Sequence, residues 1–245
     1  MKTLTALPIL LSVLLMTQSA LASDWKGRAE AGFISASGNT ESDTLNVGLR
    51  FKHNATAWSH DIALNAYKAS NATVDSANNV KAEYTLKRDL TERSNLFASL
   101  SYLDDDFDGF TEQSSASFGY GYKVIDTESK AWEVAAGVGY RDTKELQRRA
   151  DGRDVIGKEL SNTTVVLRSD YRQQLTTNTE FVDAFRAEVG SENTFVENDL
   201  ALVVSMNERF ALKAGFIVRH NTDPSEGADN TDTITSLNLV YNFTQ

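Results

Sequence analysis

The sequence predicts an all-β protein, an antiparallel up-and-down transmembrane β-barrel of about 12 strands. Apolar and polar residues alternate along segments throughout the chain, as expected for strands with one apolar and one polar face. Long polar connections alternate with short turns, which is typical of transmembrane barrels. After the N-terminal region, no apolar run is long enough for a spanning helix, so crossing a membrane would require strands.

The first 22 residues have the pattern of a secretory signal peptide. Lys2 precedes an apolar run, and Ala20-Leu21-Ala22 provides small residues for cleavage before Ser23. We therefore expect residues 1–22 to be a signal peptide and residues 23–245 to form a barrel in the outer membrane of a Gram-negative bacterium.

The composition narrows the range of functions. Cysteine is absent, so strand pairing and burial must stabilise the fold without disulfides. Only two prolines are present, which suits long unbroken strands. The net charge of −10 argues against nucleic acid as a partner, because phosphates require a basic surface.

The first hairpin shows the alternation clearly. From Trp25 to Phe33, apolar or small residues alternate with Lys26, Arg28 and Glu30, and the alternation resumes from Leu45 after a polar stretch. Ten further strands are predicted near residues 57–67, 79–88, 96–102, 116–124, 132–140, 161–172, 178–189, 198–204, 210–218 and 235–243. Asp183 and Asn198 fall on the apolar face, which suggests a bulge or a different register there.

The odd-numbered connections are polar and mostly long, and we expect them outside the cell. They are residues 35–43, 68–79, 104–113, 142–160, 190–194 and 221–231. The even-numbered connections are short turns, which we place at the periplasmic end together with both termini.

Four short motifs carry a family resemblance: the Trp-x-Gly start at Trp25, the Ser-Gly-Asn-Thr-Glu turn at 37–41, DDDFDGF at 104–110 and FGYGYKVIDTE at 118–128. With these motifs the chain resembles the salt-induced outer-membrane proteins, also catalogued as domain of unknown function 481. The resemblance covers the whole mature chain. It implies an outer-membrane β-barrel, supplies no substrate, and suggests through its name a link to salt or osmotic stress.

The polar face of the predicted strands carries basic and acidic side chains in nearly equal numbers. The candidates for the barrel lumen are Arg28, Glu30, Arg50, Lys81, Glu83, Glu133, Arg168, Asp170, Arg186, Glu188 and Lys213. Such charges either pair across strands and hold the wall together, or line a conducting or ligand-binding passage. Glycines on the same face fit a crowded interior.

No catalytic or cofactor-binding residues are predicted. His53, His60 and His220 fall on the apolar face at strand ends, which argues against a histidine-dependent hydrolase in the lumen. Hydrolysis by carboxylates at the rim, or binding of a partner by the loops, remains the alternative function.

A calcium site is a further candidate. Asp104, Asp106, Asp108 and Gly109 match the first half of a calcium-binding loop, but Ser115 occupies the position of the bidentate glutamate. The alternative is an acidic external loop that carries no specific site, and divalent cations are candidate ligands of such loops.

We therefore expect a narrow pore or a structural component of the envelope, and no enzyme. Its expected partners are outer-membrane lipid, lipopolysaccharide and the barrel-assembly machinery.

Overall fold

In the computed structural model, the chain forms a closed barrel of antiparallel strands. The structure describes residues 25–37, 42–69, 78–105, 110–148, 154–191, 193–223 and 229–243. The strands are β1 (Trp25–Ser37), β2 (Ser42–Asn54), β3 (Trp58–Ala69), β4 (Asn78–Asp89), β5 (Ser94–Asp105), β6 (Phe110–Asp126), β7 (Lys130–Arg148), β8 (Asp154–Gln174), β9 (Thr179–Gly190), β10 (Thr194–Ser205), β11 (Phe210–Asn221) and β12 (Thr231–Phe243). Each strand pairs with its sequence neighbours, and β1 closes the barrel against β12. The predicted fold class is confirmed.

The signal-peptide prediction concerns residues 1–22, which lie outside the described residues, and it stays a prediction. Within the described part of the chain, no helix is long and apolar enough to cross a membrane.

The outer surface of the barrel is apolar. Large side chains that alternate along the strands are exposed there: Phe33, Leu45, Val47, Leu64, Val80, Leu100, Phe118, Val138, Val165, Leu202, Leu212, Phe216, Leu237 and Leu239. Leu100 and Leu237, each near the centre of its strand, are 57% and 58% exposed. A soluble protein would bury such residues, so this surface is suited to lipid.

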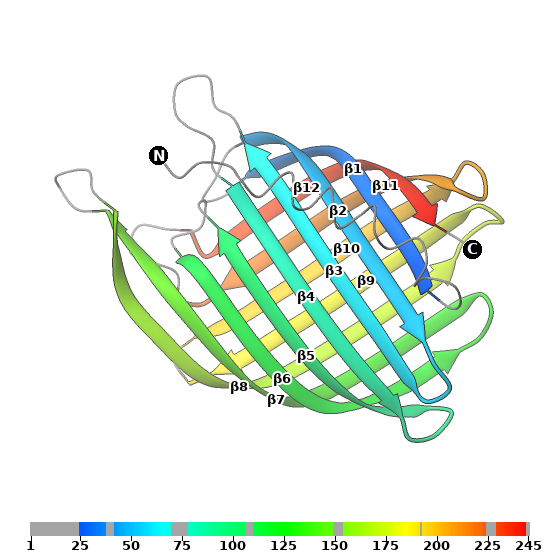
Figure 1. Cartoon of the computed structure of the whole chain (residues 1–245), viewed down its shortest axis with the longest axis horizontal. Helices are drawn as coiled ribbons and strands as arrows, with labels where there is room; N and C mark the ends of the chain where they lie inside the picture. The colour runs from blue at the N-terminus through cyan, green and yellow to red at the C-terminus, as the bar shows by residue number, and fades with distance from the viewer. Residues whose placement is uncertain are drawn as a thin grey trace, which may run out of the picture.

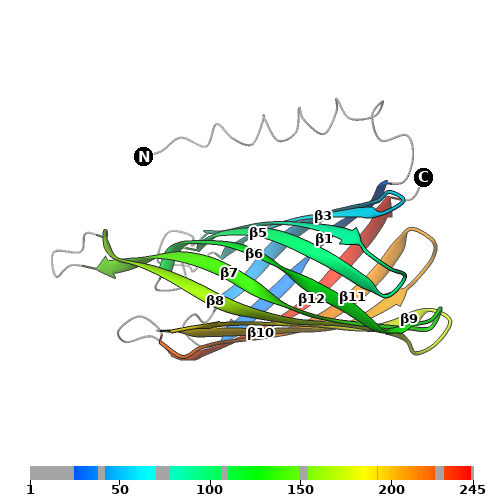
Figure 2. The ribbon, with the colours of Figure 1, turned by 90° about the horizontal axis from the view of Figure 1, so that it is seen from below.

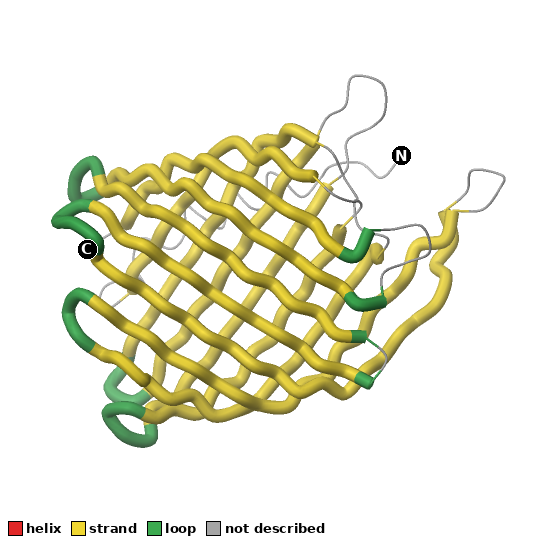
Figure 3. Tube along the Cα trace, turned by 180° about the vertical axis from the view of Figure 1, so that it is seen from behind, coloured by secondary structure: helices red, strands yellow, loops and turns green. Residues whose placement is uncertain are grey.

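The barrel is flattened (Figures 1 and 2). One broad wall, which includes β4 to β7, lies over a second wall that includes β9 to β11. Short turns at 55–57, 90–93, 127–129, 175–178 and 206–209 lie together at one end (Figure 3), which we call the short-turn end. Because Gly27 pairs with Phe243, β1 starts and β12 finishes at this end.

The prediction of a long loop at 142–160 was wrong. β7 continues to Arg148 and β8 starts at Asp154, so this hairpin projects beyond the other strands (Figure 1). Strands also extend into the links predicted at 35–43 and 104–113. The reason is physical: a strand outside the bilayer needs no apolar face, so the alternation ends while backbone pairing continues.

Asp183 and Asn198 lie in the outward face, and no bulge interrupts the pairing of β9 with β10. Phe185 pairs with Asn198 and Leu200 with Asp183, and the two polar side chains are hydrogen-bonded to each other. Mutual pairing, which the alternation alone does not reveal, therefore reduces the cost of two polar groups on an apolar surface.

The wall is tightly packed where β6 meets β7. Gly119 and Gly137 pair directly, and the Phe97 side chain on β5 covers Gly119. A Cβ atom at Gly119 would lie 2.3 Å from the carbonyl oxygen of Ala136 and 2.6 Å from the Phe97 ring. Because the first of these contacts is with backbone, it cannot be relieved by a side-chain rotation.

We expect Gly119→Ala to destabilise the barrel by about 1–3 kcal/mol, the usual cost of overpacking. Gly48→Ala is the matched control on the inner face, since the one tight contact of its Cβ would be with the Asn65 side-chain oxygen, at 2.9 Å. Urea unfolding of both variants in lipid bilayers would measure the difference. Equal costs would contradict the tight β6–β7 packing.

Candidate functional site: the lumen of the barrel

The inner face of the wall combines polar, charged and apolar side chains. Apolar residues interrupt the polar face of several strands, and Phe97, Val166, Val203, Ile234 and Val240 are buried inside. They were not among the predicted lumen residues, although their position on the polar parity of each strand was a visible signal. They reduce the space left for water.

Among the described residues, two ion pairs connect β4 with the opposite wall. Lys81 Nζ on β4 lies 3.5 Å from Glu197 Oε1 on β10, and these strands are directly opposite each other in the ring. Arg186 Nη1 on β9 lies 3.7 Å from Glu83 Oε1, also on β4. Opposite walls of the flattened barrel are therefore connected by charge pairs at this level.

Further ion pairs hold the crossing residues in place. Arg219 Nε donates a hydrogen bond to Glu197 Oε2 at 2.7 Å, and Lys81 lies 3.2 Å from Glu83. Arg186 also pairs with Glu188, whose second oxygen lies 3.6 Å from Arg141. We call these seven residues the central network: Lys81, Glu83, Arg141, Arg186, Glu188, Glu197 and Arg219.

The central network is poorly accessible to water. The side chains of Lys81, Glu197 and Arg219 are 16–17% exposed, and Glu188 is only 3% exposed. Charges in such surroundings attract each other more strongly than on an open surface, and a lost partner is costly. The network therefore resists opening.

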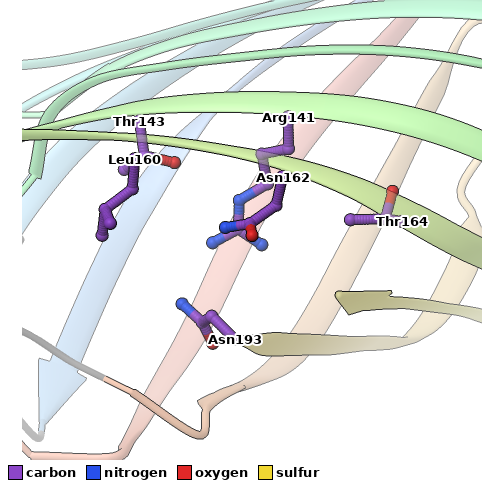
Figure 4. Close-up of a pocket in the computed structure, with 6 residues that line it drawn as sticks. All are labelled: Arg141, Thr143, Leu160, Asn162, Thr164 and Asn193. Carbon is purple, nitrogen blue, oxygen red and sulfur yellow. The ribbon is translucent and has the colours of Figure 1, made fainter. Parts of the chain in front are cut away.

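Two small cavities adjoin the central network. A cavity of about 50 Å³ is lined by Lys81, Arg141, Arg186, Glu197 and Arg219, among others. A second cavity of about 10 Å³ lies where Arg141 on β7 and Asn193 before β10 point toward each other (Figure 4). The first has room for a few water molecules and the second for about one.

A second set of contacts lies between the central network and the short-turn end. The Arg168 guanidinium stacks over the Phe97 ring, 4.8 Å from its centroid, and also bonds Ser117. Lys87 Nζ bonds Glu133 Oε1 at 2.7 Å, and this oxygen also accepts from Asn95. These contacts join strands that are not neighbours, so they too narrow the lumen.

The remaining predicted lumen residues lie closer to the wall. Lys213 on β11 lies 3.3 Å from Glu30 on β1, and Arg28 lies 3.8 Å from the same carboxylate. Arg50 makes a bidentate bond to Asp61 on the adjacent strand, at 2.8 and 2.6 Å. Asp170 pairs in register with Glu133 and stays exposed.

The histidines lie on the outward face, as the alternation predicts. His53 stacks on Trp25 with ring centroids 4.8 Å apart, and His60 accepts or donates a hydrogen bond with the Tyr84 hydroxyl at 2.9 Å. These rings form an aromatic row at the short-turn end, the position of an interfacial girdle. His220 contacts Thr231 near the opposite end.

The calcium prediction is not tested. Asp106 and Asp108 lie outside the described residues, and Asp104 is exposed near the end of β5. Among the described residues, no group of carboxylates and histidines could hold a metal ion.

Comparisons with known proteins agree with this architecture. A family model described as "Protein of unknown function, DUF481" matches residues 29–243. The uncharacterized protein YdiY of Escherichia coli strain K12 is 28% identical over 222 residues, which cover 89% of this chain and 83% of that protein. The family description mentions no salt response, so the link to salt stays a prediction.

Two solved structures have a similar fold. The NanC porin has a TM-score of 0.53 at 11% identity, covering 87% of this chain and 98% of its own. The translocator domain of the autotransporter NalP from Neisseria meningitidis has a TM-score of 0.54 at 10% identity, covering 96% and 94%. At these identities the likeness concerns the fold alone, which is that of outer-membrane β-barrels.

Proposed function

Because the chain belongs to the family of proteins of unknown function DUF481, whose description gives no activity, we propose a function from the lumen itself: a narrow outer-membrane pore held nearly closed by its central network. Its apolar outer surface and aromatic row suit a bilayer. The pore would pass small solutes at low rate rather than act as a general porin.

The observation that carries the proposal is the pair of ion bridges between opposite walls, Lys81–Glu197 and Glu83–Arg186. Barrels of about eight strands are filled by side chains, whereas those of about sixteen leave an aqueous channel. A twelve-stranded barrel is intermediate, so side chains decide its conductance. In this barrel, side chains from opposite walls contact each other across the lumen.

The charge balance predicts how such a pore treats ions. The central network contains the cations Lys81, Arg141, Arg186 and Arg219 and the anions Glu83, Glu188 and Glu197. Nearly equal numbers of each sign should give weak selectivity. Acidic external loops could attract cations to the mouth, an effect that salt screens over about 10 Å at 0.1 M.

Recording single channels of the refolded protein in planar bilayers tests the proposal. We expect conductance well below that of a general porin measured in the same bilayer, with weak selectivity that fades toward about 1 M salt. Large openings, or strong selectivity that persists at high salt, would contradict it. Complete absence of conductance under all voltages would instead favour a structural role in the envelope.

A further inference from the structure

Like charges face each other across β1 and β2 at the short-turn end. Lys26 pairs in register with Lys52, and Arg28 pairs with Arg50. All four residues have the inward parity of their strands. On this inner face Arg28 also contacts Glu30, and Arg50 contacts Asp61. We call these four residues the basic square.

This arrangement is unfavourable unless something compensates it. Like charges placed directly opposite on neighbouring strands destabilise a sheet. Among the described residues, only two carboxylates form ion pairs with the square, and each is shared between two cations. Asp61 pairs with Arg50 and Lys52, and Glu30 pairs with Arg28 and Lys213. Four cations against two shared anions leave a local excess of positive charge.

The square is accessible to solutes, unlike the central network. The side chains of Arg50 and Lys52 are 52% and 51% exposed, and that of Arg28 is 35% exposed. The outward face at the same level carries the stacked Trp25 and His53 rings. The square therefore lies on the inner wall at the mouth of the barrel, level with the expected membrane interface.

The spacing of the square suits a small anion with several charged groups. Opposed residues have Cβ atoms about 5 Å apart, and successive inward residues on one strand are about 6.6 Å apart. Guanidinium groups bind carboxylates or phosphates in a bidentate manner, while lysines act as mobile point charges. Two arginines flanked by two lysines can thus contact separate anionic groups of one molecule.

We propose that the basic square binds a soluble polyanion that carries two or more carboxylate or phosphate groups, at the short-turn mouth of the barrel. The site goes beyond the proposed pore function, because binding at the mouth requires no conduction. Bound anion would neutralise the opposed cations and so stabilise the folded barrel.

Calorimetric titration of citrate into the purified full-length mature protein, in lipid-free detergent micelles, tests the proposal. Lys26→Gln/Arg28→Gln removes two positive charges from β1 and leaves the Asp61 contacts intact. The matched control is Lys123→Gln/Arg172→Gln, which removes two positive charges from the inner faces of β6 and β8 near the same end, where each cation has its own carboxylate. Because both doubles change the net charge equally, a difference between them reports on position.

We expect citrate to bind the wild type, its affinity to fall about tenfold in the β1 double variant, and to change less than about twofold in the control. Spermidine, a polycation, should give no binding. Equal weakening in both double variants, or no citrate binding to the wild type, would overturn the proposal. Neither result would bear on the proposed pore, which is tested by conductance.

A stability measurement provides an independent readout if the double variant does not fold. Lys52→Gln removes one member of an opposed lysine pair, so its urea midpoint without citrate should equal or exceed that of the wild type. Citrate should raise the wild-type midpoint and raise that of Lys52→Gln less. A lower midpoint without citrate together with an undiminished citrate effect would show that the square is not an anion site.

Discussion

The double substitution Lys81→Ala/Glu83→Ala is expected to raise single-channel conductance several-fold. It removes both β4 side chains that reach the opposite wall. The double substitution leaves the net charge unchanged. The two residues that lose a partner each keep another ion pair, Glu197 with Arg219 and Arg186 with Glu188. The fold should therefore survive while the lumen widens at the level of the central network.

The matched control is Arg172→Ala/Glu180→Ala, which deletes an ion pair of 3.1 Å between the adjacent strands β8 and β9. This pair lies within one wall and does not cross the lumen, so its loss should leave conductance nearly unchanged. Single-channel recordings of both variants and of the wild type would measure the difference in conductance. An unchanged Lys81→Ala/Glu83→Ala conductance would show that the central network does not limit permeation.

Leu237→Arg is expected to destabilise the barrel by about 2–4 kcal/mol, the cost of a cation on the lipid face at the bilayer midplane. Leu237 is central in β12 and 58% exposed on the outer surface. The free energy of unfolding in lipid bilayers, from urea titration, measures the effect.

Leu212→Arg makes the same chemical change on the same face near the short-turn end, two residues from the start of β11. Leu212 is 42% exposed. There the cost should be smaller, because the side chain lies closer to the interface. Costs that do not depend on depth would mean that this surface does not face a bilayer.

Strand positions and faces were predictable because both follow from local alternation. Leu100, Val138 and Leu237 lie on the apolar parity of the sequence and on the outer surface of the structure. The ends of β7 and β8 were not predictable in this way, since their polar extensions lack an apolar face. The outward pair Asp183 and Asn198 likewise broke the pattern without breaking the register.

The alternation along the sequence was enough to predict that charged residues of both signs share the inner face, because parity places a side chain on one side of a strand. It did not determine which charges meet. Lys81 and Glu197 are 116 residues apart and contact each other only because the closed ring places β4 opposite β10 and flattens. The register of β1 with β2 likewise decided that Arg28 faces Arg50. Such contacts depend on closure, flattening and register, which are properties of the whole sheet.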